Sequence, residues 1–392
     1  MSRPGLFLIF FLAVFLQSGT YGLTFLLPEL FAEFGANEKN VGQTLLVTAV
    51  VTLVTVYYSG HLSDVFGRMT TLGISGFTIT AALFLFSTAE TIGTTIYVAS
   101  GLIGFGWGLM YTLAPVVLTR LSGAEARVQL FSLYAVFLMA GFGLSPVFAS
   151  WLETWGLGIR DAFRMVGVFC AVSGSMFLML SKVVEKHAIS VTTDNRSRLS
   201  LSAVKDIFQS RAWVPVVMVC LGASVFAGVN NFQTVIAASE GLNYADYFLI
   251  YTFTTVICRV AFARFKGGAA PYRIIGFLHS IMSASVLLFL FIDGSQVVYI
   301  ACAILFAVGY GASYPILVAM AANDADEDLV PQTLQLFSLT YFIGIFGFPL
   351  VAGWLIVDFS ISTLLIFVAI IAGIEACMAF GRHRSNTRLR HS

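Results

Sequence analysis

The chain has few charged residues. Only 10% of its 392 residues are Asp, Glu, Lys or Arg, whereas a soluble globular protein carries about 25%. The net charge is +1 and no basic tract alternates with aromatic residues, so nothing indicates a nucleic-acid partner. Apolar residues make up 58% of the sequence and the mean hydropathy is +0.90. This balance is typical of a protein embedded in a lipid bilayer.

Residues that perform catalysis or bind metals are also scarce. The five histidines do not lie beside a plausible nucleophile or a second metal ligand: His61, His187, His279, His383 and His391. The five cysteines all fall in apolar segments and are interpreted as reduced, unpaired small hydrophobes: Cys170, Cys220, Cys258, Cys302 and Cys377. We therefore expect no enzymatic activity, no cofactor and no resident metal.

Long apolar stretches dominate the chain. A membrane-spanning helix needs about 20 apolar residues, and the stretches lack the alternation that membrane β-strands require. Twelve spans are predicted: 5–27, 41–62, 70–88, 95–118, 128–150, 162–183, 212–238, 246–266, 272–292, 297–320, 331–356 and 360–381. The first stretch is too long for the core of a signal peptide, so we expect it to remain in the mature protein.

The basic residues predict the orientation. Lys and Arg accumulate on the cytoplasmic side of membrane proteins. With the amino terminus inside, the outer loops contain only Lys39, Arg160 and Arg164, and Arg259 falls within a span. We therefore expect a multi-pass protein of a bacterial inner membrane, with both termini cytoplasmic. The predicted divisions are an N-terminal six-helix bundle (1–183), a cytoplasmic linker (184–211), a C-terminal six-helix bundle (212–381) and a cytoplasmic tail (382–392).

The two halves of the sequence match after a shift of 203 residues. This shift places Gly106, Trp107, Gly108 and Tyr111 on Gly309, Tyr310, Gly311 and Tyr314. It also places Gly141, Pro146, Ala149, Trp151 and Leu152 on Gly344, Pro349, Ala352, Trp354 and Leu355. Because one offset serves two separate helices, we interpret the halves as copies. The copies share one orientation, since an even number of spans separates them, and an axis along the membrane normal should relate them.

A short motif lies between the second and third stretches, formed by Gly60, Leu62, Asp64, Gly67 and Arg68. It resembles the loop signature of the major facilitator superfamily, whose members move small solutes across membranes. The resemblance implies an all-α fold of two six-helix bundles related by pseudo-two-fold symmetry, with a central cavity bordered by stretches 1, 4, 7, 8, 10 and 11.

The same motif has a physical interpretation. Glycines permit the turns of a short loop, and the Asp64 carboxylate can pair with Arg68 or with another cationic or helix-N-terminal group. We predict that Gly60, Asp64, Gly67 and Arg68 form a gating motif that latches the cytoplasmic side. The alternative is a plain charged turn that only obeys the orientation rule.

The eighth stretch carries a polar stripe. Its members are Tyr247, Tyr251, Thr255 and Arg259, spaced four residues apart on one helix face, whereas the other faces are apolar. A charge in hydrocarbon costs at least about 2.5 kcal/mol, so Arg259 indicates a cavity or a partner. Arg264 follows five residues later, and snorkelling of Arg259 to the inner surface is the alternative.

Similar side chains in the other stretches complete a candidate substrate site. The set is Gln17, Tyr21, Trp107, Tyr111, Asn230, Asn231, Tyr251, Thr255, Arg259, Tyr310 and Tyr314. For each polar member the alternative is a hydrogen bond to a backbone carbonyl or to a neighbouring helix. No Asp or Glu lies in the middle of the cavity stretches, so proton coupling is left open.

These residue types predict the solute. Aromatic faces, amides and one possible cation suit a flat, hydrogen-bonding organic molecule, either neutral or negatively charged. As a whole the chain resembles the facilitator branch that contains bacterial riboflavin and copper importers, and its lack of paired methionines favours riboflavin. We expect a monomer that takes up such a compound by alternating access. Proton-coupled efflux of drugs or metabolites, copper import, and a non-transporting sensor are the alternatives.

Overall fold

The computed structural model describes residues 3–121, 124–187, 199–262 and 270–391. The described residues of the first half form α1 (Arg3–Thr24), α2 (Leu27–Ala32), α3 (Glu38–Phe66), α4 (Arg68–Thr88), α5 (Thr94–Leu121), α6 (Ala124–Glu153) and α7 (Ile159–His187). Those of the second half form α8 (Leu201–Gln209), α9 (Trp213–Asn230), α10 (Gln233–Ser239), α11 (Tyr244–Phe262), α12 (Pro271–Leu288), η2 (Phe289–Phe291), α13 (Gln296–Asn323), η3 (Glu327–Leu329), α14 (Val330–Phe342), the π-helix η4 (Ile343–Gly347), α15 (Phe348–Asp358) and α16 (Ile361–His391). No strand occurs in these ranges.

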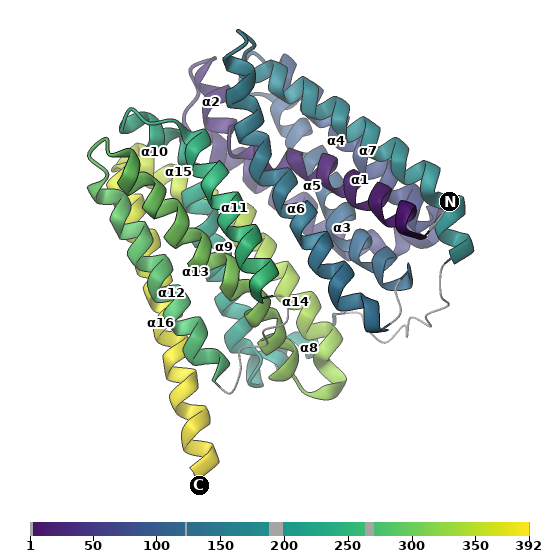
Figure 1. The fold of residues 1–392 in the computed structure, drawn as a ribbon, viewed down its shortest axis with the longest axis vertical. Coiled ribbons are helices and arrows are strands. Elements are labelled where there is room, and N and C mark those ends of the chain that lie inside the picture. The colour runs from purple at the N-terminus through teal and green to yellow at the C-terminus, as the bar shows by residue number, and fades with distance from the viewer. Residues whose placement is uncertain (1–2, 122–123, 188–198, 263–269, 392) are drawn as a thin grey trace.

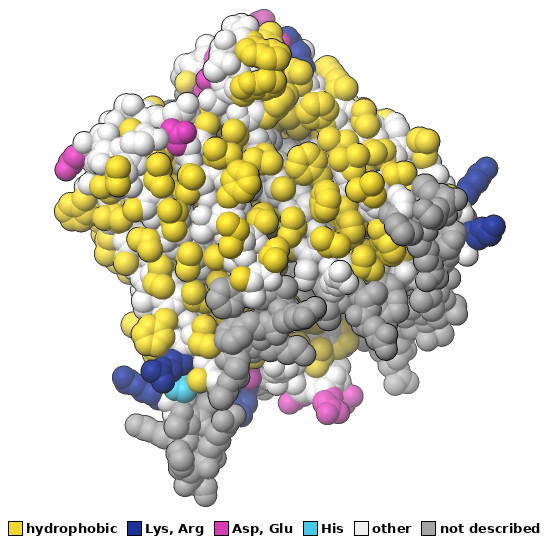
Figure 2. Space-filling view, viewed as in Figure 1, with side chains coloured by type: hydrophobic (Ala, Val, Ile, Leu, Met, Phe, Trp, Pro, Cys, Tyr) yellow, Lys and Arg dark blue, Asp and Glu magenta, His cyan; other side chains and the backbone are white. Residues whose placement is uncertain are grey.

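Eleven helical segments of the described chain are long and apolar enough to cross a bilayer. One of them joins α14, η4 and α15 end to end. The polar helix α11 packs among them and supplies the twelfth crossing that the sequence predicts. In Figure 2 apolar side chains cover the middle of the visible face, and charged side chains gather at its margins.

The crossings form two bundles, α1 to α7 and α9 to α16, which lie side by side (Figure 1). The bundles contact each other chiefly where α3 packs on α15 and α6 packs on α11. We call the end that carries α8 and the chain termini the linker end, and the end that carries α2 and α10 the distal end. The predicted all-helical fold of two six-helix bundles is confirmed.

The internal repeat is visible as a contact across the bundle interface. The hydroxyl oxygens of Tyr111 and Tyr314 lie 3.0 Å apart, and the two residues are separated by 203 positions. Residues related by a two-fold axis touch each other only when both lie close to that axis. This pair therefore marks the pseudo-two-fold axis, and the offset found in the sequence is the structural one.

Small residues allow the helices of each bundle to approach closely. A Cβ atom on Gly104 would lie 2.6 Å from the Thr48 carbonyl oxygen, and one on Gly106 would lie 2.9 Å from that of Ser75. Both distances are shorter than a side chain tolerates. These glycines of α5 therefore serve helix packing, as expected for small residues in membrane helices.

The signature between the second and third spans differs from the predicted loop. Helix α3 continues through Gly60 and Asp64 to Phe66, and α4 begins at Arg68. Only Gly67 turns the chain, with a φ of +82° that favours glycine. The predicted loop is thus a single residue, because α3 remains helical beyond the apolar stretch.

Two predicted boundaries also fall inside helices. Helix α7 extends to His187, past the start of the expected linker at 184, and α16 extends to His391 through most of the expected tail. The linker itself contains the short helix α8, whose Ala203 and Ile207 are buried. Residues 188–198 of the linker lie outside the described part of the chain.

A polar cluster ties together the linker end of the second bundle. The Tyr272 hydroxyl donates a hydrogen bond of 2.7 Å to Asp324 Oδ2, and an Arg382 guanidinium nitrogen lies 3.1 Å from the same oxygen. The Arg382 guanidinium also lies 5.9 Å from the centre of the Tyr272 ring. The cluster joins α12 and α16 to the residue that follows α13.

We predict that Asp324→Asn destabilises the second bundle. It removes the charge that Arg382 pairs with in a partly buried site, which costs about 1.5–3 kcal/mol. Thermal unfolding of the purified protein should show a lower Tm. The matched control is Asp326→Asn, because Asp326 is exposed and its side chain caps no helix. Equal Tm values for the two variants would contradict the stabilising role.

Candidate functional site

A small cavity lies between the two bundles. Its volume is about 50 Å³, which holds a few water molecules and is far below the roughly 300–1,000 Å³ of a pocket filled by an organic ligand. Six of the predicted site residues line it: Tyr21, Trp107, Tyr111, Arg259, Tyr310 and Tyr314. Residues that the sequence analysis did not select also line it: Leu138, Met139, Phe142, Phe226, Tyr341 and Ile345.

Two matching aromatic stacks form opposite parts of the wall. Tyr21 of α1 stacks on Trp107 of α5, with ring centroids 5.1 Å apart and planes inclined by 22°. In the second bundle Phe226 of α9 stacks on Tyr310 of α13, at 4.7 Å and 25°. Trp107 and Tyr310 are repeat partners, whereas their stacking partners Tyr21 and Phe226 are not, so each bundle presents its own aromatic stack to one cavity.

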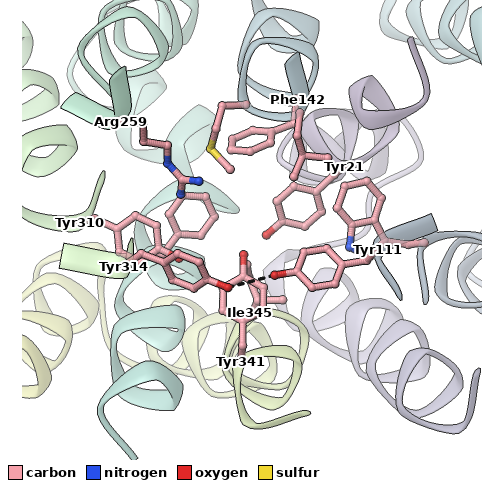
Figure 3. A pocket seen from close by; sticks show the side chains of 12 residues that line it. Tyr21, Tyr111, Phe142, Arg259, Tyr310, Tyr314, Tyr341 and Ile345 are labelled. Carbon is pink, nitrogen blue, oxygen red and sulfur yellow. Dashed lines mark hydrogen bonds between the residues drawn. The ribbon is translucent and has the colours of Figure 1, made fainter. Parts of the chain in front are cut away.

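Tyrosine rings close the cavity toward the linker end. Helices α5 and α13 both run from the distal end to the linker end, so Tyr111 and Tyr314 lie one turn beyond Trp107 and Tyr310. Their hydroxyl groups share the hydrogen bond across the bundle interface, which Figure 3 draws as a dashed line. The ring of Tyr341 stacks on that of Tyr111, with centroids 6.1 Å apart. The closure therefore depends on three side chains from both bundles.

Arg259 enters the cavity from α11. Its guanidinium points toward the central space in Figure 3 and lies 5.5 Å from the centre of the Tyr314 ring. Side chains on the opposite face of α11 are exposed: Phe253 by 58%, Ile257 by 64% and Val260 by 60%. The helix thus turns its apolar face outward and its polar stripe inward, so Arg259 does not snorkel to the bilayer surface.

Five predicted site residues are not on the cavity wall. Tyr251 and Thr255 belong to the inward stripe of α11 and are buried, and their hydroxyl groups have no hydrogen-bond partner. Gln17 donates to Ser75 Oγ at 2.8 Å and thus joins α1 to α4. The Asn230 and Asn231 amides donate to carbonyl oxygens four residues earlier on α9. For these three amides the structure favours the packing alternative, because a hydroxyl oxygen on a neighbouring helix satisfies a Gln17 donor and backbone carbonyls satisfy a donor of each asparagine.

The repeat contains a signal for the residues that were missed. The offset of 203 relates Leu138 to Tyr341 and Phe142 to Ile345, and all four line the cavity. Hydrophobic side chains alone are not distinguishable from lipid-facing or core residues in such a sequence. The offset adds information only once one member of a pair is known to line the cavity, and it does not relate Met139 or Phe226 to another lining residue.

The π-helix η4 adds a local irregularity beside the cavity. It spans Ile343–Gly347 and contributes Ile345 to the wall. Such wide turns are rare and frequently occur at functional sites. Gly344 packs tightly against α9, since a Cβ atom there would lie 2.4 Å from the Cys220 carbonyl oxygen.

Contacts between the bundles close the distal end. Lys39 of α3 forms an ion pair with Asp358 of α15, and Asn243 donates to the Ser150 hydroxyl at 3.4 Å. A Cβ atom on Gly353 would lie 2.2 Å from the Glu38 carbonyl oxygen, so backbone meets backbone there. No comparable latch involves the signature at the linker end. Asp64 is exposed, makes no ion pair with the described residues, and borders a pocket lined entirely by the first bundle.

A carboxyl group with a shifted pKa lies at the distal closure. Burial and the neighbouring Glu153 raise the pKa of Glu29 in α2 to about 8. The buried Oε2 atom of Glu29 has no hydrogen-bond partner, and Glu153 accepts a bond of 3.4 Å from the Tyr244 hydroxyl of the second bundle. Nearby cations are engaged elsewhere, because Arg160 pairs with Glu33 and Lys39 pairs with Asp358.

The described chain thus forms two helical bundles with a cavity between them, the arrangement expected of the two halves of a facilitator-type membrane protein. Residues 6–349 match the family described as the Major Facilitator Superfamily. The chain belongs to this family.

Individual relatives are distant. The plastidic glucose transporter 4 of Arabidopsis thaliana is 26% identical over 252 residues, covering 55% of this chain and 45% of the relative. The myo-inositol transporter 2 of Schizosaccharomyces pombe is 24% identical over 157 residues, covering 37% and 28%. The chain therefore aligns with less than half the length of these curated relatives.

Solved structures confirm the fold over nearly the whole chain. The nucleoside transporter NupG has a TM-score of 0.77 at 16% identity, with 96% of this chain and 98% of that chain covered. The Escherichia coli fucose:proton symporter FucP has a TM-score of 0.62 at 15% identity, with 97% and 99% covered. At these identities the likeness concerns the fold alone.

We predict that distal closure weakens as the pH rises. In the closed conformation Glu29 holds its proton up to about pH 8, whereas exposure on opening returns its pKa toward the ordinary 4.5. The closed form therefore binds more protons between these values, and each pH unit upward favours opening by up to about tenfold. Spin labels on introduced cysteines at the exposed positions Leu157 and Val297 report the distance between the bundles.

The control for this prediction compares two carboxyl groups. Glu29→Gln mimics the protonated form and should stay closed from pH 5 to pH 9. Glu90→Gln changes an exposed glutamate of the α4–α5 connection and should respond to pH like the wild type. A wild-type distance that does not change with pH would count against the role of Glu29.

Proposed function

We propose that this protein moves a small organic solute across a membrane by alternating access. The observation that supports it best is the presence of one aromatic stack in each bundle, Tyr21 on Trp107 and Phe226 on Tyr310, at one cavity between the bundles. A solute between them contacts both bundles at once. Its binding can therefore bias the equilibrium between conformations open at opposite ends.

The cavity must enlarge before an organic solute can bind between the bundles. Its volume of about 50 Å³ is too small for an organic solute. In this conformation Tyr21 stacks on Trp107 and Phe226 stacks on Tyr310. Separation of the Tyr111 and Tyr314 hydroxyl groups would open a route from the linker end. With the linker end in the cytoplasm, as the distribution of basic residues favours, this conformation is closed to the outside.

The flat lining favours a solute with a planar ring system. Aromatic faces stack on such rings, and tyrosine hydroxyl groups orient polar substituents. We retain riboflavin uptake across a bacterial inner membrane as the specific proposal, because the ring fits the stacks and the whole-chain resemblance favours it. Drug or metabolite efflux and copper import are alternative outcomes of the same transport assay.

We further propose that the signature latches the linker end when the distal end opens. Asp64 and Arg68 lie at the adjacent ends of α3 and α4, beside Arg120 of α5. Because Asp64 is exposed, its carboxylate is available to the second bundle in a conformation where the linker ends of the two bundles approach each other. The distal closure and this latch would then alternate.

The first test of the proposal is solute exchange. Protein in liposomes preloaded with riboflavin should accumulate labelled riboflavin by counterflow. Trp107→Ala should reduce exchange by about fivefold or more, because losing one aromatic stacking partner costs about 1–3 kcal/mol. Trp107→Phe should retain most of it. Trp155→Ala is the control, since Trp155 is 65% exposed and outside the cavity. Absence of riboflavin exchange in the wild type would reject this substrate.

The second test concerns the latch. Asp64→Asn should lower the transport rate while the amount of protein in the membrane stays unchanged, because the substitution removes charge from an exposed residue. Asp206→Asn, at an exposed position of α8, is the control and should transport normally. Transport by Asp64→Asn at the wild-type rate would leave the signature as a plain charged turn.

A further inference from the structure

The cavity has an unbalanced electrostatic character. Arg259 is charged, and no Asp or Glu is present among the described residues that line the cavity. Arg259 forms no ion pair or hydrogen bond with any residue of the described chain, and its buried Nε atom has no partner. Its one close contact is the face of the Tyr314 ring.

This arrangement leaves the Arg259 guanidinium without a hydrogen-bond acceptor from the described chain. A guanidinium has five N–H donors and no acceptor, and it keeps its charge under all ordinary conditions. A charge removed from water is normally paired, since an unpaired charge in a low-dielectric site is costly. The site offers tyrosine rings and hydroxyl groups instead of a carboxylate. The buried hydroxyl groups of Tyr21 and Tyr251 are likewise without partners.

The position of Arg259 is fixed by the helix that carries it. The opposite face of α11 is apolar and exposed, whereas Tyr251 and Thr255 on the Arg259 face are buried. Rotation of α11 that moved Arg259 away from the cavity would bury lipid-facing side chains and expose polar ones. The fold therefore holds a positive charge without an acidic partner at the wall of the cavity.

We propose that the transported solute carries an anionic group, a carboxylate or a phosphate, that binds the guanidinium of Arg259 while its ring stacks on the aromatic wall. This inference rests on the proposed transport function and replaces neutral riboflavin with an anionic flat solute as the preferred substrate. Both anionic groups present oxygen atoms that match the planar guanidinium fork through two parallel hydrogen bonds. Arg259 is then the residue that determines charge specificity.

Figure 3 shows an arrangement in which Arg259 could bind the anionic group while the aromatic rings stack on the solute ring. Arg259 and Tyr310 approach the central space from the second bundle, and the Tyr21 hydroxyl points into it from the first. A ring between the stacks would therefore have its anionic substituent on the side of α11. Among flat heterocycles, a phosphorylated or carboxylated compound should be preferred over its neutral counterpart.

Matched ligand pairs test the proposal on the full-length protein in lipid nanodiscs. Nicotinate and nicotinamide share one ring and differ in charge, and so do riboflavin 5′-phosphate and riboflavin. Dissociation constants are measured by calorimetry and by the ligand-induced shift in Tm. The wild type should bind at least one anionic member at least about tenfold more tightly than its neutral partner.

Variants assign the effect to Arg259. Arg259→Gln should weaken binding of that anion by about 30-fold or more, as expected when one partner of a buried charge pair is removed, and change neutral binding by less than about threefold. Arg259→Lys keeps the charge but loses the fork, so its affinity should lie between. Arg164→Gln is the control, because Arg164 is exposed and pairs with Asp161. Gel filtration and the Tm without ligand verify folding.

Three results would overturn the inference. The first is equal affinity of the wild type for the charged and neutral members of each pair. The second is an equal loss of affinity for the anion and its neutral partner in folded Arg259→Gln or Arg259→Lys. The third is that neither anion binds. The outcome is separable from that of the transport assay. Anion binding through Arg259 without solute exchange would reject transport alone, whereas exchange of neutral riboflavin by a wild type that binds both members of each ligand pair equally would reject this inference alone.

Discussion

A polypeptide in hydrocarbon has to satisfy its backbone hydrogen bonds internally, because no water is available to bind an unpaired amide or carbonyl. This constraint makes the described chain almost entirely helical and covers its outside with apolar side chains. It also limits where chemistry can occur. Polar and aromatic side chains cost least where two bundles face each other, so they concentrate along the shared axis. The cavity is a direct consequence of that concentration.

The duplicated halves place repeat partners around the cavity, whereas residues that differ between the halves determine its charge. Trp107 and Tyr310 are repeat partners, as are Tyr111 and Tyr314, and both pairs line the cavity. The scaffold is therefore symmetric around the solute position. The charge around the cavity is not symmetric, because the offset that relates the halves places Arg259 on Val56 of the first bundle. One aromatic stack from each bundle, together with a single cation, gives a bound molecule one orientation instead of two.

Much of this organisation could be predicted from the sequence, because spans, repeat and polar stripe are all periodic patterns. The exceptions have physical causes. Asn230 and Asn231 looked like cavity residues, but a helix offers each amide a carbonyl one turn away. Phe142 and Ile345 looked like packing residues, since an apolar wall and an apolar core use the same side chains. The distal closure depends on contacts such as Lys39 with Asp358, which lie 319 positions apart and follow no local pattern.

The small volume of the cavity bears on how binding and movement are linked. In this conformation Tyr21 stacks on Trp107 and Phe226 stacks on Tyr310, so protein rings fill space that a solute ring would take. Entry of a flat solute exchanges one set of stacking contacts for another, and the net gain from the ring itself is therefore small. A weak net gain leaves the two access states close in free energy, which transport requires. What the protein rings cannot supply is a counter-charge for Arg259. Discrimination among flat solutes consequently falls to that residue, while the rings provide a surface on which many of them fit.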